Sequence, residues 1–402
     1  GKYSVGFYDS LIFCEKEQYS QYEYEGSTPL FLQIWHPIAQ TTHEKRLKIN
    51  DFRKRNLSND LASVYKPLCQ KMDSAFVYYY IYNIQEDSIN NTTHSYFDIL
   101  DTLQNYKTQS YYNNIHVNSN LPVIIYHHGS QGNSDENVVL AEYFASRGYI
   151  VVSSNYHLPY ENDNYGHSEG SENEAINLTK KVIEFARSLT TIDEVYFIGH
   201  SWGAQVGFSL LHERGWANAF VSMETTLEDK STKDIKLEWP SLDSLMHIHE
   251  KNFSLPILML TGKIDALPWE EEEMINLPFE FFRNITNAPT IHATTKEVFW
   301  HNSYISASFL KYLFRDQFVQ SPSNTLSLKK QLELYKEHLK LIEDFIKSCR
   351  DNYLFDKTKY KLVECLYGKI YQVVVDCREN SPTFLKLDSF LLDHLNPKMI
   401  LM

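Results

Sequence analysis

One serine stands between two glycines in a chain that has only 14 glycines in 402 residues. The stretch GHSWG (199–203) follows the apolar run EVYFI and precedes a segment with helical spacing that starts at Ala204. A serine held in a tight strand-to-helix turn projects its hydroxyl beyond the sheet edge, where it can act as a nucleophile. Gly199 and Gly203 leave room for neighbouring backbone that a Cβ would block. We therefore predict that Ser201 is a catalytic nucleophile rather than only a helix cap.

A nucleophilic serine needs a base that accepts its proton. His301, in KEVFWHNSYIS, follows the last predicted strand and precedes the predicted helix SASFLKYLF, so its loop can lean over the sheet edge toward Ser201. His292 is the rival, but it lies inside the apparent strand TIHAT. We therefore predict His301 as the general base, with the backbone N–H of Trp202 at the helix start stabilising an oxyanion.

Two carboxylates could hold that histidine in its working tautomer. Asp265, in LTGKIDALPW, follows the predicted strand PILML and lies before His301 in the chain. Glu224, in FVSMETT, follows the preceding predicted strand. Both stand between the serine and the histidine, as the chain order serine, acid, histidine requires. We favour Asp265 as the acid, with Glu224 as the alternative.

Strands and helices alternate on both sides of the serine. Short apolar runs indicate buried strands, and amphipathic segments indicate helices between them. The expected strands are 29–35, 121–129, 149–154, 194–199, 219–223 and 256–262, and the expected helices are 137–148, 174–189 and 204–215. This alternation predicts an α/β fold with a mostly parallel central sheet and helices on both faces.

The chain is expected to have one main domain with two additions. Residues 1–321 form the α/β domain, in which the polar region 40–118 is an insertion, and residues 322–402 form a C-terminal extension. Apolar residues at steps of three and four predict a long amphipathic helix from about 325 to 350. We favour packing of this helix on the main domain over a dimer seam, which leaves a monomer or a homodimer. A further strand is expected at 369–377.

Composition limits the partners. The net charge of −13, with both signs interspersed, argues against nucleic acid as the main partner. No apolar run reaches the ~20 residues of a membrane helix. His247 and His249, in MHIHE, have no clear third ligand, so neither a metal nor a cofactor is predicted. The chain starts with Gly1 and shows no signal peptide, which fits a leader already removed and leaves the compartment open.

The stretches YHHGSQGN and GHSWGA, together with the strand order, resemble the α/β-hydrolase superfamily. Within it, residues 121–315 look like serine esterases related to platelet-activating-factor acetylhydrolase and dienelactone hydrolase. The opening LQIWHP is similar to the strand that begins many such proteins. The resemblance covers about half of the chain and leaves the region 40–118 and the C-terminal extension unexplained.

The resemblance implies further site residues. Its HG loop supplies a second oxyanion donor, which maps here to the backbone N–H of Ser130. Acetylhydrolase-like relatives carry an Asp where this chain has Glu224, and the superfamily's strand-end acid maps to Asp265. In the loop 156–173, Tyr156, His157 and Tyr160 are candidate pocket walls.

The function expected from these residues is hydrolysis of a small-molecule carboxylic ester through an acyl-enzyme, without a cofactor. One alternative is a serine peptidase acting on small peptides. A non-catalytic binding protein on a hydrolase scaffold is the other.

Overall fold

The computed structural model of the chain describes residues 1–40, 45–88, 96–113, 119–130, 132–161, 171–211, 213, 215–227, 237, 239–242, 255–261, 290–294, 301–313, 315, 326–350, 369–375 and 387–393. Asp265, His247 and His249 lie outside these residues.

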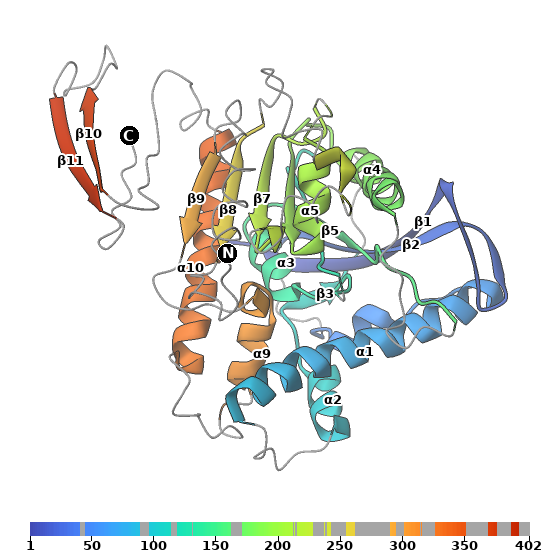
Figure 1. Cartoon of the computed structure of the whole chain (residues 1–402). Helices are drawn as coiled ribbons and strands as arrows, with labels where there is room; N and C mark the ends of the chain where they lie inside the picture. Colours follow the sequence, from blue (N-terminus) through green and yellow to red (C-terminus); the bar gives the residue numbers. More distant parts are fainter. Residues whose placement is uncertain are drawn as a thin grey trace.

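A nine-stranded sheet forms the centre of the protein (Figure 1). Its strand order is β3-β1-β2-β5-β4-β6-β7-β8-β9. The strands are β1 (Ser4–Gln21), β2 (Tyr24–Ile38), β3 (Ser110–Tyr112), β4 (Val123–His127), β5 (Ile150–Ser154), β6 (Val195–His200), β7 (Ala219–Met223), β8 (Ile257–Thr261) and β9 (Thr290–Thr294). The six strands from β5 to β9 in this order pair in parallel, whereas β2 pairs antiparallel with both β1 and β5. The fold class expected from the sequence is confirmed.

Both faces of the parallel strands are buried, which explains their unbroken apolar runs. On one face, Ile125, Val152 and Phe197 pack against helices α4 (Glu172–Ser188) and α5 (Trp202–Ser209). On the other face, strand residues including Ile124 and Ile198 pack against α3 (Val138–Ala145) and α10 (Leu328–Arg350).

The C-terminal helix α10 is part of the main core. Its Leu339, Ile342 and Ile346 are buried in the same apolar cluster as residues of β4, β6 and β8. Figure 1 shows this helix, in orange, beside the β8–β9 end of the sheet. The apolar stripe therefore packs on the α/β domain, as its spacing indicated. After it, β10 (Lys369–Val375) and β11 (Leu387–Asp393) pair as a separate antiparallel sheet.

The region 40–118 contains more regular structure than its sequence pattern suggested. It holds the 3-10 turn η1 (Ile49–Arg53), α1 (Asn59–Ser88), α2 (Tyr96–Asn105) and the edge strand β3. The first half of α1 packs on the β1–β2 hairpin through Leu61, Val64 and Leu68, which share a cluster with Phe31. The region is thus built onto the sheet rather than projecting from it.

Several helices and strands begin or end a few residues away from the predicted boundaries. The helix expected at 204–215 begins at Trp202 and ends at Ser209, so the turn at Ser201 leads directly into it. The first strand was expected at 29–35, but β2 extends over Tyr24–Ile38.

Candidate functional site

Ser201 sits in a strained turn between β6 and α5. Its backbone has φ 51° and ψ −116°, a conformation that residues with a Cβ rarely adopt. Its N–H donates to the carbonyl oxygen of Met223 at 2.9 Å, which fixes the turn against the end of β7. Its side chain makes no capping hydrogen bond to α5. A helix cap therefore does not account for this serine.

Close approach of backbone explains the glycines on either side of the serine. A Cβ on Gly199 would lie 2.4 Å from the carbonyl oxygen of Gly203. A Cβ on Gly203 would lie 2.3 Å from the carbonyl oxygen of His127 on β4. Both separations are far below a permitted contact, so only glycine fits at these two positions.

The loop after β4 lies directly against the nucleophile turn. The N–H of Gly132 donates to the carbonyl oxygen of Gly129 at 2.9 Å, which closes the turn that contains Ser130. A Cβ on Gly129 would lie 3.2 Å from Cβ of Ser201, so this loop and the serine are immediate neighbours. Trp202 follows Ser201 in the chain, and Ser130 follows Gly129 in the loop that lies against Ser201, so both stay candidates for the oxyanion donors.

Two histidines brace this loop as neutral rings. Nδ1 of His128 lies 2.7 Å from the carbonyl oxygen of Gly129 and must therefore donate. Its Nε2 then accepts from the N–H of Tyr156 at 3.1 Å. His127 bonds through Nδ1 to the carbonyl oxygen of His128, and complete burial holds the pKa of His127 well below its ordinary value.

His301 and Glu224 meet at the same edge of the sheet. His301 begins the 3-10 turn η3 (His301–Tyr304), just before α9 (Ala307–Leu313), and Glu224 follows β7. Nδ1 of His301 lies 3.8 Å from Oε2 of Glu224. This distance lies within ion-pair range and exceeds a hydrogen bond, as is common for catalytic pairs before a substrate binds. Glu224 immediately follows Met223, whose carbonyl oxygen accepts from the N–H of Ser201, so Glu224 lies at the strand end next to the serine turn.

Burial sets the charge state of His301. It lowers the pKa of His301 below the ordinary histidine value, and Glu224 opposes this shift. A histidine that stays neutral at neutral pH can accept a proton. The other two predicted partners stay predictions: Asp265 lies outside the described residues, and the backbone of His292 is part of β9, which pairs with β8.

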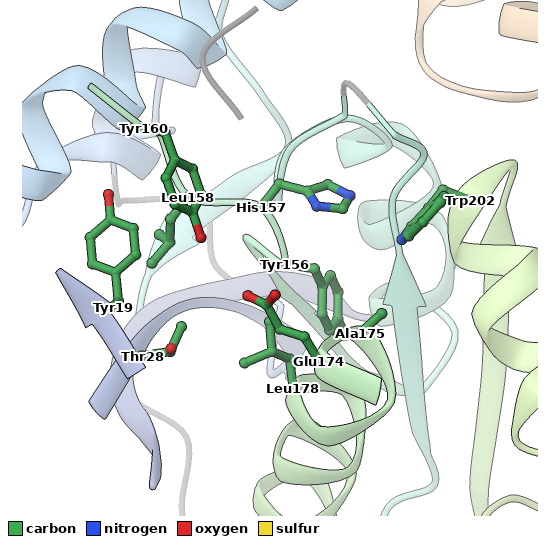
Figure 2. Close-up of a pocket in the computed structure, with 10 residues that line it drawn as sticks. All are labelled: Tyr19, Thr28, Tyr156, His157, Leu158, Tyr160, Glu174, Ala175, Leu178 and Trp202. Carbon is green, nitrogen blue, oxygen red and sulfur yellow. The ribbon is translucent and has the colours of Figure 1, made fainter. Parts of the chain in front are cut away.

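A pocket opens beside Trp202, the residue after the nucleophile. Tyr156, His157 and Tyr160 line it, as expected from the sequence. Figure 2 shows Trp202 at one end and Tyr19 and Tyr160 at the other. The other residues that line it are Thr28, Leu158, Glu174, Ala175 and Leu178.

Two donors at this pocket have no hydrogen-bond partner within the part of the chain that the structure describes. They are the hydroxyl of Tyr156 and Nε1 of Trp202, both shielded from solvent. Burial raises the pKa of Glu174 on the same wall. The pocket is thus aromatic with a few polar atoms, which is typical of small-molecule sites.

Sequence reasoning missed two residues of the site, His200 and Glu136. Nδ1 of His200 lies 3.2 Å from Oε1 of Glu136, and Nε2 of His200 lies 3.2 Å from the carbonyl oxygen of His301. The pair is 64 residues apart, so no local spacing connects them. The only local signal was a histidine directly before the nucleophile.

Neither a metal cluster nor a membrane span is found in the described parts of the chain. No three His, Cys, Asp or Glu side chains there are grouped as metal ligands. None of the described helices is both long and apolar enough to cross a bilayer.

Family comparisons place the site in a known fold. Residues 122–244 match the family model described as alpha/beta hydrolase fold, a stretch that contains the loop after β4, Ser201 and Glu224. Residues 353–402 match the model of dTDP-4-dehydrorhamnose 3,5-epimerase, and β10 and β11 fall within that match. A search among curated proteins gave no significant match.

Solved structures agree with the fold. A ferulic acid esterase from Streptomyces cinnamoneus is similar over 86% of this chain and 90% of its own, with 13% identity and a TM-score of 0.52. A monoacylglycerol lipase from Paleococcus ferrophilus covers 58% of this chain and 100% of its own, with 13% identity and a TM-score of 0.35. The protein has the α/β-hydrolase fold. The finer resemblance to platelet-activating-factor acetylhydrolase and dienelactone hydrolase stays a prediction.

Proposed function

We propose that this protein is a serine hydrolase that cleaves carboxylic esters, with Ser201 as nucleophile, His301 as base and Glu224 as acid. The observation that carries the proposal is the strained turn of Ser201 beside the His301–Glu224 pair. Strain of this kind persists in folded proteins mainly where a function requires it.

The reaction follows from the roles of these groups. His301 takes the hydroxyl proton of Ser201 as the oxygen attacks the ester carbonyl. The N–H groups of Trp202 and Ser130 stabilise the oxyanion of the tetrahedral intermediate. The intermediate collapses, His301 gives its proton to the leaving alcohol, and an acyl-enzyme remains. Water, activated by the same histidine, then releases the acid. Glu224 fixes the histidine tautomer and stabilises the imidazolium that forms.

Glu224 is preferred here over Asp265 because of its position relative to His301. The sequence alone favoured Asp265, which lies outside the described residues. Glu224→Gln should lower turnover by as much as ~10⁴ while preserving the fold. Asp265→Asn is the matched variant. If Asp265→Asn loses turnover and Glu224→Gln keeps it, the acid is Asp265.

The side chains that line the pocket beside Trp202 are mostly aromatic or apolar, so we expect a flat or apolar group of the ester to pack there. A structure with a similar fold is, by its name, a ferulic acid esterase. A panel of nitrophenyl esters with acyl groups of increasing length and with aromatic acyl groups measures this preference.

Labelling with a fluorophosphonate tests the function. The intact protein should take up one label, and Ser201→Ala should take up none and lose ester hydrolysis. Ser130→Ala is the matched control, because its proposed contribution is a backbone N–H that alanine retains. Absence of labelling in the intact protein would instead indicate a non-catalytic binding protein. Cleavage of peptide anilides in preference to esters would indicate the peptidase alternative.

A further inference from the structure

A buried carboxylate joins the loop after β4 to the nucleophile strand. Oε1 of Glu136 accepts from the hydroxyl of Tyr126 at 2.6 Å and faces the N–H of Gly129 at 3.4 Å. The same oxygen lies 3.2 Å from Nδ1 of His200. An oxygen that faces three donors acts as an ionised acceptor. Burial raises the pKa of Glu136, but His200 and Tyr126 outweigh it and the pKa lies below its ordinary value.

The ring of His200 differs from that of His128 in what its nitrogens face. Nε2 of His128 accepts from a backbone N–H, so one of its nitrogens carries no proton. In His200 both nitrogens face acceptors, the carboxylate of Glu136 and the carbonyl oxygen of His301. A carbonyl oxygen cannot donate, so Nε2 of His200 is the donor in its contact with His301, and Nδ1 lies against the carboxylate of Glu136.

We propose that the buried His200–Glu136 pair positions the turn carrying His301 and the loop carrying Ser130. The proposal rests on the hydrolase function proposed above. His200 and Glu136 are positioning residues, since neither is assigned a contact with the substrate. Through His200 the pair holds the backbone of the base, and through Gly129 it holds the start of the oxyanion loop.

Two glycines of the loop make room for the His200–Glu136 pair. A Cβ on Gly129 would lie 3.1 Å from Nδ1 of His200, so glycine is needed for the ring to approach the loop. A Cβ on Gly132 would lie 1.9 Å from Oε2 of Glu136. Both glycines of the loop therefore leave space for the two members of the pair.

His200 also acts on the base. The ring centroids of His200 and His301 are 4.7 Å apart. The titratable groups that face His301 are His200, which lowers its pKa, and Glu224 and Glu136, which raise it. Removing the imidazole, in His200→Gln, should therefore raise the pKa of His301. The acid limb of kcat/KM should move to higher pH.

Nuclear magnetic resonance tests the contacts of the pair without using activity. In uniformly ¹⁵N-labelled Ser201→Ala protein, the ring signals of His301 and the backbone amide signal of Gly129 should shift in both His200→Gln and Glu136→Gln, because the pair contacts both segments. Replacing His36, which is remote from both segments, should leave these signals in place. The proposal is overturned if neither His200→Gln nor Glu136→Gln shifts them, or if His36→Gln shifts them equally.

Kinetics test the positioning role. Displacement of a catalytic group by about 1 Å can cost ~10²-fold in rate. We expect His200→Ala to lower kcat by 10- to 100-fold with KM within twofold, and His200→Gln to recover part of the loss, since its amide can donate to the His301 carbonyl. His36→Gln is the matched control, because His36 is also buried and bonds a backbone carbonyl, that of Asn113, at 2.9 Å. It should leave kcat unchanged.

The outcomes separate the two proposals. If the wild-type protein hydrolyses no ester, the proposed function fails, and the resonance signals still decide whether the pair holds the two segments. If the wild-type protein is active and His200→Ala keeps full kcat and an unchanged pH profile, the positioning role is wrong. If kcat of His200→Ala falls only in proportion to the fraction of protein that the fluorophosphonate labels, the labelled molecules are fully active. The pair then supports folding and not the turn of His301, and the proposal also fails.

Discussion

Replacing Arg53 with methionine should destabilise the protein strongly. Arg53 ends η1, and its guanidinium lies between Asp135, at 2.9 Å from Nε, and Asp73 of α1. The side chains of Arg53 and Asp135 are 4% and 0% exposed. Asp135 directly precedes Glu136, so this ion pair ties the region 40–118 to the loop beside the nucleophile.

The expected magnitude follows from the burial of the pair. Removing one partner of a buried ion pair typically costs about 3–5 kcal/mol, because it leaves an uncompensated charge. An unfolding entropy of roughly 2.1 cal/mol/K per residue gives about 0.8 kcal/mol/K for a chain of this length. The melting temperature should therefore fall by about 4–6 °C.

The sign of the pH dependence provides a second check. Burial raises the pKa of Asp135, and Arg53 opposes this rise. Without Arg53 the folded-state pKa of Asp135 rises further above its unfolded value. Such a group binds more protons in the folded than in the unfolded state. The free energy that the unpaired carboxylate costs the folded protein therefore grows as pH rises through the folded-state pKa. The destabilisation in Arg53→Met should be larger at neutral pH than at acidic pH.

Calorimetry of three variants completes the test. Arg53→Met should lose stability, and Arg53→Met with Asp135→Asn should recover part of it because the unpaired charge is gone. Lys329→Met is the surface control, since Lys329 lies 4.0 Å from Glu333 with both side chains exposed, and it should change stability by no more than ~1 kcal/mol. The reasoning is refuted if Arg53→Met has the melting temperature of the wild type. It is also refuted if the double variant is no more stable than Arg53→Met.

Four further changes have defined outcomes. Leu339→Asp should cost several kcal/mol in chemical denaturation, because Leu339 is 2% exposed, whereas Leu341→Asp on the same helix, 37% exposed, should be tolerated. Gly203→Ala should abolish ester hydrolysis in a rate assay, since its Cβ would meet a carbonyl oxygen at 2.3 Å. Burial lowers the pKa of His338 to about 4, so the stability that its neutral ring contributes is lost as pH falls from about 6.5 to 4. In His338→Gln the melting temperature should therefore depend less on pH over this range. The lowered pKa of His301 should place the acid limb of kcat/KM below the ordinary histidine range.

The parallel strands and the nucleophile turn could be predicted because their signals are local. A strand buried on both faces reads as an apolar run, and the serine turn needs its two glycines within five residues. The place of His301 between a strand and a helix was also predictable, whereas its role as a base stays a prediction. These elements depend on the nearest neighbours in the chain.

The acid and the His200–Glu136 pair could not be predicted because they depend on distant contacts. Glu224 and Asp265 both follow strands, and only the fold brings Glu224 to 3.8 Å from His301. Glu136, in the loop between β4 and α3, meets His200 at the end of β6. The long helix α1 was missed because it contains Pro67 and lacks a clear amphipathic period, and contacts with the β1–β2 hairpin stabilise it.

The support that α10 gives to the turn of His301 determines when the site can form during synthesis. Tyr335 donates to Asn137, which is 198 residues earlier, at 2.6 Å, and the ring of His338 stacks on that of Tyr304. Chains fold from the N-terminus as they emerge from the ribosome. Ser201 therefore emerges long before the helix that braces its base. Until α10 emerges, the part of the apolar sheet face that it covers is exposed, so the nascent chain is open to aggregation at that stage.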